Sequence, residues 1–498
     1  MVAAGLILAG IAASCSRAAP ALTREVFLTF DNLTGDASLD WIAQAAPKML
    51  ESDLTGLPKT VPLTAPAVRD AYLERATQMV HGYFEIRSGK LHFEIEVEDA
   101  ENHRMIQTAS EDGEFLDAMN RAAKVLDPAA HPFPASAAAA TAWGQGRYET
   151  AVMLDPDFAL GWLGWIEQIA ASPDPARANE AKEIAERALA RPGLRSPIDR
   201  ARLELAAATL RQDNAARIAA MRKLVELVPA DSSVLGALAE TEMNARRFTD
   251  AARDYQDFVR ADPGNVSASN LLGYAQAFAG DLDGARKAFE AYGRQPGQAV
   301  NALDSLGEAL FVNGKFDQAE RAFLDAYQKN PAFLQGATLW KAAHARWLAG
   351  DLAGADKIAE RYWQDRAKAH DALLVWRRAN WLYETGRRQQ AVELLKMDTL
   401  AAGAPQEAAD VAQRQLQVWN NLQSVPSDLA ELEKGYQRSS PTSDGLVRTL
   451  YAEALVRAGR TADARGLVKL WPLPEQTDLL QALMYPKFIE LRETLQPY

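Results

Sequence analysis

Two stretches of the chain, NLLGYAQAFAGDLDGARKAFEAY (residues 270–292) and DSLGEALFVNGKFDQAERAFLDAYQKNP (residues 304–331), align on one another without gaps. A Leu-Gly pair, an alanine and a phenylalanine recur in them with a step of 34 residues, at Leu272-Gly273 and Leu306-Gly307, Ala285 and Ala319, and Phe289 and Phe323. A fixed period of this length predicts repeated structural units that stack on one another.

The markers have a physical meaning in paired helices. Small residues such as Gly273 and Ala285 let two antiparallel helices approach closely, and we expect the aromatic residue to fill the gap to the next pair. A proline twelve residues after the alanine, as at Pro331, ends the second helix. The pattern resembles the tetratricopeptide repeat. The resemblance implies a mainly α fold, an α-solenoid over residues 141–498 preceded by a small α/β domain.

The same resemblance implies a binding groove. In tetratricopeptide proteins the first helix of each pair lines a groove, mainly at its fifth, ninth and twelfth positions. These positions hold Asn270, Tyr274 and Ala277, then Asp304, Glu308 and Phe311, then Trp340, His344 and Trp347, and then Trp376, Asn380 and Tyr383. Aromatic residues are favoured at interfaces. The predicted partner-binding residues are therefore Tyr274, Glu308, Phe311, Trp340, His344, Trp347, Trp376, Asn380 and Tyr383.

An alternative for the aromatic groove residues is that their rings pack between repeats, because buried aromatics are common in helical cores. The Lys/Asn clamp by which some tetratricopeptide proteins hold a peptide C-terminal carboxylate is absent at these positions. This absence favours an apolar or mildly basic peptide as the ligand of the groove.

Residues 22–126 predict a mixed α/β region. EVFLTF (25–30) is typical of a strand, residues 37–56 and 114–126 have helical spacing, and MVHGYFEIRSGKLHFEIEVEDAENH (79–103) alternates around a tight turn, which predicts a hairpin. Together with the loop F-x-N-L-T-G-D (30–36), these elements resemble the TolB-like amino-terminal domain. That family has no settled catalytic residues, so the resemblance implies none here.

Three carboxylates, Glu94, Glu96 and Glu98, alternate with apolar residues in the second strand of this hairpin. They therefore share the outer face of one strand, where they either bind a cation or a basic partner or form a solvated surface, as is normal for half-buried antiparallel strands. The region is followed by residues 127–140, which hold three prolines and an alanine run and which we interpret as a linker.

Cys15 is the single cysteine of the 498-residue chain and follows the uncharged residues 2–14. A helix of thirteen residues rises about 20 Å, which is too short for a hydrocarbon core of about 30 Å but typical of a signal peptide. Ala12-Ala13-Ser14-Cys15 resembles the lipobox of bacterial lipoproteins, although Ala12 replaces the usual Leu or Val and no Lys or Arg precedes the apolar run. The resemblance implies a signal peptide over residues 1–15, lipidation of Cys15 and a periplasm-facing lipoprotein of the bacterial cell envelope. The alternative is an ordinary thiol.

Several function classes are disfavoured by composition. The net charge of −12 disfavours nucleic acid as a partner, and one cysteine excludes an intramolecular disulfide or a cysteine-based zinc site. No two of the six histidines lie three to five residues apart, and no nucleophile elbow, phosphate loop or dinucleotide fingerprint is present. We therefore expect no enzyme, cofactor or metal.

The function that remains is a scaffold of the cell envelope that binds a protein or peptide partner and is held at the membrane by its lipid. The alternative is the sensory or regulatory part of a signalling protein, such as a transcriptional regulator, cyclase or kinase, whose effector domain is absent. TolB-like domains followed by tetratricopeptide repeats occur in both settings.

Overall fold

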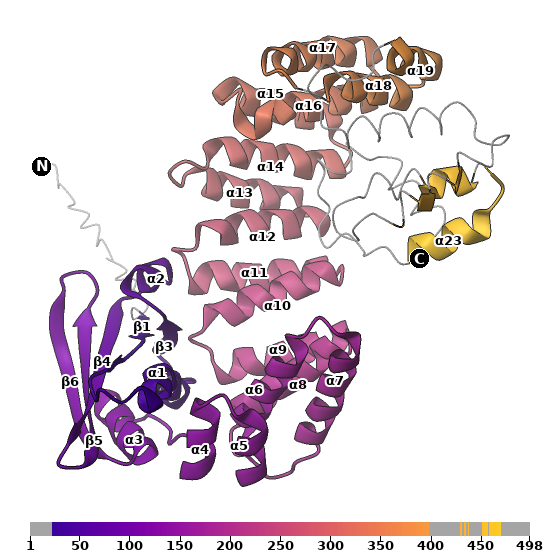
Figure 1. The fold of residues 1–498 in the computed structure, drawn as a ribbon. Coiled ribbons are helices and arrows are strands. Elements are labelled where there is room, and N and C mark those ends of the chain that lie inside the picture. The colour runs from indigo at the N-terminus through magenta and orange to yellow at the C-terminus, as the bar shows by residue number, and fades with distance from the viewer. Residues whose placement is uncertain are drawn as a thin grey trace, which may run out of the picture. The chain divides into compact units, whose positions relative to one another are not determined.

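The computed structural model describes residues 22–371, 373–397, 429–430, 433–434, 437, 451–456 and 458–469 (Figure 1). Cys15 and the signal peptide predicted over residues 1–15 lie outside these residues. The packing divides the chain into two compact units, one that ends at Thr241 and one that begins at Glu242.

The first unit contains one mixed sheet. Its strands are β1 (Thr23–Leu28), β2 (Asp31–Asn32), β3 (Thr60–Ala65), β4 (Gln78–Arg87), β5 (Lys90–Asp99) and β6 (Arg104–Gly113). The order is β3-β1-β4-β5-β6, with β2 paired to β4. β1 is parallel to β3 and β4, and β4, β5 and β6 form an antiparallel meander. The predicted hairpin is confirmed, since Phe84 lies opposite Phe93 and Ser88 and Gly89 turn the chain with positive φ.

Helices cover the sheet of this unit on both faces. On one face α1 (Asp40–Leu54) and α3 (Phe115–Leu126) share a core with Phe84 and Phe93. A short 3-10 helix, η1 (Ala37–Leu39), leads into α1. On the other face the small α2 (Val68–Leu73) packs its Ala71 against Val26 and Met79. The strand over 25–30 and the helices over 37–56 and 114–126 were predicted, whereas β3, α2 and β6 were not.

The segment 127–140, which the sequence suggested to be a linker, is packed. Phe133 is only 3% exposed and belongs to the hydrophobic cluster of the sheet and α1. The backbone N–H of His131 donates to the carbonyl of Asp53 at 2.7 Å. Residues 137–140 open a helix that Ser136 caps. Its prolines therefore direct the chain along the core surface, and no break in the packing occurs here.

A succession of helices forms the rest of the described chain. In the first unit they are α4 (Ala137–Gly144), α5 (Tyr148–Leu154), α6 (Ala159–Ala170), α7 (Pro175–Leu189), α8 (Pro197–Leu210) and α9 (Asn214–Leu227), and α10 (Ser232–Asn244) spans the boundary. The second unit has α11 (Phe248–Ala261), α12 (Val266–Phe278), α13 (Leu282–Gly293), α14 (Ala299–Val312), α15 (Phe316–Lys329), η2 (Phe333–Gly336), α16 (Ala337–Leu348), α17 (Leu352–Lys368), α18 (Leu374–Glu384), α19 (Arg388–Met397) and α23 (Thr461–Lys469). The fold is a mainly helical, tetratricopeptide-like repeat array preceded by a small mixed-sheet α/β region.

The markers of the repeat have the packing roles that close helix approach requires. Ala285 and Ala319 are fully buried. A Cβ atom on Gly273 would lie 2.5 Å from the ring of Phe289, so only glycine lets this ring approach α12. Gly307 and Phe323 repeat the arrangement at the same distance. Each ring therefore lies against the first helix of its own pair, in addition to the expected role of filling the gap to the next one.

Candidate functional site

A chain of polar side chains crosses three consecutive first helices of the array. The hydroxyl of Tyr274 on α12 donates to Glu308 Oε2 on α14 at 2.6 Å. Lys341 Nζ on α16 donates to Glu308 Oε1 at 2.5 Å and to Asp304 Oδ2 at 2.7 Å. Tyr274 and Glu308 occupy the same position of successive repeats, 34 residues apart. Stacking of the repeats thus brings these four residues together.

The polar chain is buried and keeps its charge. Lys341 is 1% exposed and Asp304 is 4% exposed. Burial by itself lowers the pKa of the Lys341 ammonium, but the charges of Glu308 and Asp304 outweigh it and raise that pKa above its usual value. Burial and the neighbouring Glu308 raise the pKa of the Tyr274 phenol, which therefore stays a donor. Two carboxylates around one ammonium leave this part of the first-helix face with an excess of negative charge.

Beside this chain lies a cluster of aromatic rings. The ring of Trp340 on α16 has its centroid 4.9 Å from that of Trp363 on α17 and 5.3 Å from that of Trp381 on α18. His344 Nδ1 donates to the carbonyl of Trp340 at 2.9 Å, and its Nε2 lies 3.3 Å from Glu384 Oε2. The cluster joins three helices and holds the imidazole in one orientation.

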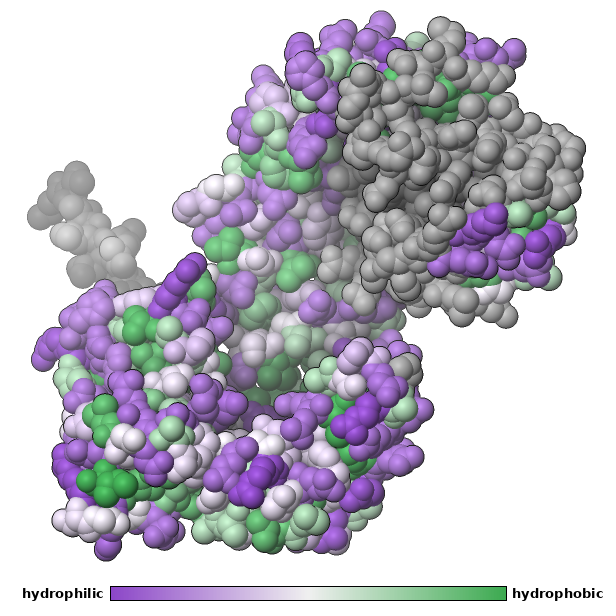
Figure 2. Space-filling view, in the orientation of Figure 1, coloured by the Kyte–Doolittle hydropathy of each residue, from purple (hydrophilic) through white to green (hydrophobic). Residues whose placement is uncertain are grey.

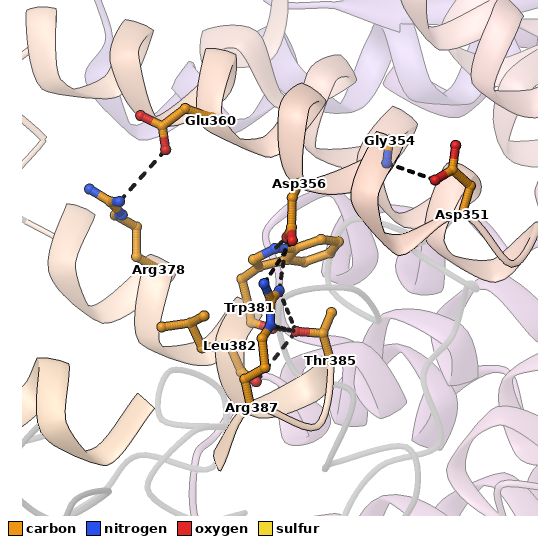
Figure 3. A network of polar contacts seen from close by, with 9 residues as sticks. All are labelled: Asp351, Gly354, Asp356, Glu360, Arg378, Trp381, Leu382, Thr385 and Arg387. Carbon is orange, nitrogen blue, oxygen red and sulfur yellow. Dashed lines mark hydrogen bonds and ion pairs between the residues drawn. The ribbon is translucent and has the colours of Figure 1, made fainter. Parts of the chain in front are cut away.

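A cleft of about 720 Å³ opens between α17 on one side and α18 and α19 on the other. Its lining includes Trp363, Trp381, Leu382 and Leu394, and its charged side chains come from both sides. Figure 3 shows these helices and the polar contacts at the cleft. The visible surface in Figure 2 is mainly hydrophilic, with separate apolar spots, so that this cleft is better defined than any patch on that face.

One wall of the cleft is held by a saturated ionic contact. Arg387 donates through Nη1 to Asp356 Oδ2 at 2.7 Å and through Nη2 to Asp356 Oδ1 at 2.8 Å (Figure 3). The indole Nε1 of Trp381 donates to the same carboxylate at 2.8 Å, and Arg387 Nε donates to Thr385 Oγ1 at 3.0 Å. Burial by itself raises the pKa of Asp356, but its bonds to Arg387 and Trp381 outweigh it and hold that pKa below its usual value.

Comparison with known proteins supports the interpretation of the helices. Residues 237–299 match the model of the tetratricopeptide repeat family. The helical region is a tetratricopeptide-like repeat array. No curated protein matches the chain.

Among solved structures, the MamA protein is 20% identical over 34% of this chain and 92% of its own, with a TM-score of 0.29. Yeast Tom70 is 12% identical over 72% of this chain and 88% of its own, with a TM-score of 0.35. The structure of Naa15/Naa10 bound to HypK-THB is 16% identical over 72% of this chain and 57% of that one, also with a TM-score of 0.35.

The repeat array places the predicted groove residues at two depths. Trp340, His344 and Trp376 are 6%, 2% and 6% exposed, and both tryptophan rings belong to hydrophobic clusters, as the packing alternative expected. The others are half-buried: Tyr274, Glu308, Phe311, Trp347, Asn380 and Tyr383. The structure brings Tyr274 to Glu308, and His344 to Trp340 and Trp347. Their role in binding a partner stays a prediction.

Lys341 was not predicted as part of the site. It interrupts the largely apolar stretch ATLWKAAHARWL of α16, and it lies 33 residues after Glu308. A charged residue within an apolar first helix, one repeat after a carboxylate, is a signal that the sequence does contain. The cleft residues Asp356, Arg378 and Arg387 carry no comparable signal, because isolated charges on exposed helix faces are common.

The first unit contains two buried carboxylates of a different kind. Asp53 at the end of α1 is 1% exposed, and no described residue hydrogen-bonds to either of its carboxylate oxygens. Burial raises the pKa of Asp53 to about 8. Glu25 in β1 is 7% exposed, and burial together with the charge of Asp127 raises its pKa to about 7.

The acidic face of β5 is engaged by histidines. Phe93, Ile95 and Val97 are buried, which confirms that the intervening carboxylates share the outer face. Glu98 accepts from His81 Nε2 at 2.8 Å and from His103 Nδ1 at 2.5 Å. Within the described ranges no group of three or more His, Cys, Asp or Glu side chains is arranged to hold a metal ion. No helix in the same ranges is both long enough and apolar enough to cross a membrane.

Proposed function

We propose that this protein is a non-enzymatic scaffold that holds a protein or peptide partner along the first helices of its repeat array. Tetratricopeptide proteins typically mediate protein–protein interactions. The observation that carries the proposal is the row of half-buried polar and aromatic side chains on consecutive first helices, with Tyr274 on α12, Glu308 and Phe311 on α14 and Trp347 on α16. The excess of carboxylates over Lys341 favours a partner segment with basic and apolar residues.

The test uses two tryptophans of the same helix that differ in exposure. Trp347 is half-buried, whereas Trp340 is 6% exposed in the aromatic cluster. Trp347→Ala should weaken partner capture by about 2 kcal/mol, as truncation of an aromatic hot spot does, and leave the thermal midpoint nearly unchanged. Trp340→Ala should cost about 3–5 kcal/mol of folding stability. Partner capture is measured by pull-down of the mature protein followed by mass spectrometry. Unchanged capture by a folded Trp347→Ala variant contradicts the proposal.

We further propose that the scaffold belongs to the bacterial cell envelope, with its lipid at Cys15 and a TolB-like domain over residues 22–126. The support is the lipobox-like sequence and the loop and hairpin quoted above. Several acyl chains hold a protein at a membrane firmly, whereas one chain binds only marginally. The protein should therefore partition into detergent and incorporate a labelled fatty acid, and Cys15→Ser should release it. An unlabelled wild-type protein would exclude the anchor.

A further inference from the structure

The cleft between α17 and α18–α19 arises because the stacking of the array changes there. α11 on α12, α13 on α14 and α15 on α16 pack along much of their lengths, whereas α18 packs on α17 far more sparsely. His370 adopts a positive φ of 53° in the connection between these two helices. The volume left between them, about 720 Å³, is in the range of ligand-binding pockets and has room for several side chains.

The charges in the cleft are sorted by wall. The carboxylates Asp356 and Glu360 project from α17, whereas Arg378, Arg387 and Arg388 come from α18, the turn after it and the start of α19. Asp356 and Arg387 satisfy one another, as described above. Leu382 and Leu394 contribute apolar surface on the arginine side, and Trp363 contributes it from α17.

The remaining charges at the cleft are loosely held. Arg378 Nη2 lies 3.6 Å from Glu360 Oε2, beyond hydrogen-bond distance, and the two side chains are 47% and 50% exposed (Figure 3). Arg388 is exposed, donates to the hydroxyl of Tyr383 at 2.9 Å and covers the ring of that tyrosine. Such an exposed ion pair is worth little, so its arginine exchanges partners at small cost. Two guanidinium groups with spare donors thus face apolar surface in one cleft.

We propose that this cleft binds a partner segment that presents an acidic side chain next to a bulky apolar one. The carboxylate replaces Glu360 on Arg378 and is reached by Arg388, because a guanidinium binds a carboxylate with two parallel hydrogen bonds. The apolar side chain fills the space against Leu382, Leu394 and Trp363. The site differs from the proposed groove in place and in chemistry: the first-helix face carries surplus carboxylates, and the cleft carries surplus guanidinium groups.

The experiment uses a phage library of random seven-residue peptides, selected on the full chain and counter-selected on Gln390→Trp. Gln390 is an exposed cleft residue, so an indole at this position fills the cleft while removing no buried contact. The remaining peptides should be enriched in Asp or Glu beside Leu, Met, Phe or Trp. Their affinity is then measured by fluorescence anisotropy at two salt concentrations, and it should fall with salt.

Two arginine substitutions test the recognition directly. Arg378→Gln/Arg388→Gln should weaken binding of the selected peptides at least tenfold. Arg260→Gln, which removes an equally exposed arginine that pairs with Asp257 on α11, should leave binding unchanged. Trp347→Ala should also leave it unchanged, so that failure of the groove and failure of the cleft are distinguishable. The proposal is overturned if no peptides survive the counter-selection, if the survivors lack acidic residues, or if the double variant binds them as the wild type does.

Discussion

Asp53 in the first unit and Asp304 in the repeat array are both carboxylates with almost no exposed surface, but their surroundings differ. Asp304 lies 2.7 Å from the Lys341 ammonium, whereas Asp53 has no hydrogen-bond partner among the described residues. Removing a charge from water is expensive unless a partner compensates. The array therefore keeps an ionised pair that joins α14 to α16, and the first unit keeps a carboxyl group that is protonated at neutral pH.

The difference teaches that the two units respond to different perturbations. In the array, loss of one member of the pair leaves an uncompensated charge in the core at any pH near neutrality. In the first unit, the raised pKa of Asp53 makes stability depend on pH instead. The following substitutions test this contrast, from the largest expected effect to the smallest.

Lys341→Met should destabilise the array by about 3–5 kcal/mol, because it leaves Asp304 and Glu308 buried without their cation. Urea unfolding, followed by the fluorescence of the tryptophan cluster around Trp340, measures the loss. A triple variant that also carries Asp304→Leu and Glu308→Met should recover most of it. A loss below about 1 kcal/mol in the single variant would show that the pair is not buried as described.

Asp53→Asn should stabilise the first unit by about 2–4 kcal/mol at pH 8. The folded-state pKa of about 8 exceeds the ordinary value of 3.8, so the unfolded chain ionises first and wild-type stability falls as pH rises between these values. Below pH 4 both states are protonated, and the variant should lose its advantage. Thermal midpoints from pH 4 to pH 8 measure the effect. Glu101→Gln, an exposed carboxylate of the same unit, is the matched control and should show no such trend.

Gly273→Ala should cost about 1–3 kcal/mol, because the added methyl group overlaps the ring of Phe289. The repeat phase predicts that Phe289→Leu in the same chain relieves the overlap. The two substitutions should therefore be non-additive in a double-mutant cycle of thermal or urea unfolding. Strict additivity would place the ring elsewhere.

Glu98→Gln should have the smallest effect, below about 1 kcal/mol at pH 6, because its partner His103 is exposed. Hydrogen bonds from His103 and His81 lower the pKa of Glu98, so its contribution is present above the ordinary value of 4.5 and is lost as pH falls through the lowered pKa. Comparing wild type and variant by thermal unfolding should show the two curves converging at low pH. A gap that widens on acidification would contradict this assignment.

The repeat architecture could be predicted from the sequence because the period of 34 residues places small and aromatic residues in one phase. The hairpin of β4 and β5 was predictable for a similar reason, since its apolar residues alternate. β6 was missed because its sequence, RMIQTASEDG, has little apolar alternation, as is typical of an edge strand. The pairing of β1 with β3 joins residues far apart in sequence and has no local signal.

The candidate site was predictable in part. The helical phase identified the first-helix positions, including Tyr274 and Glu308, which the structure joins. It did not reveal that Trp340 is enclosed, because the rings around it, Trp363 and Trp381, come from two other helices. The cleft depends on how closely α18 approaches α17, which is a property of the backbone connection and not of any residue pattern.

The sparse packing of α18 on α17 has a consequence for the mechanics of the array. In a linear stack each repeat is stabilised by its neighbours, and the interface with the least buried area transmits force least well. Under tension along the stack, the helices that follow α17 should separate in an early step, before the tightly packed pairs α12 to α16 yield. The array then acts as a stiff rod with a compliant end, and a ligand bridging α17 and α19 would stiffen it.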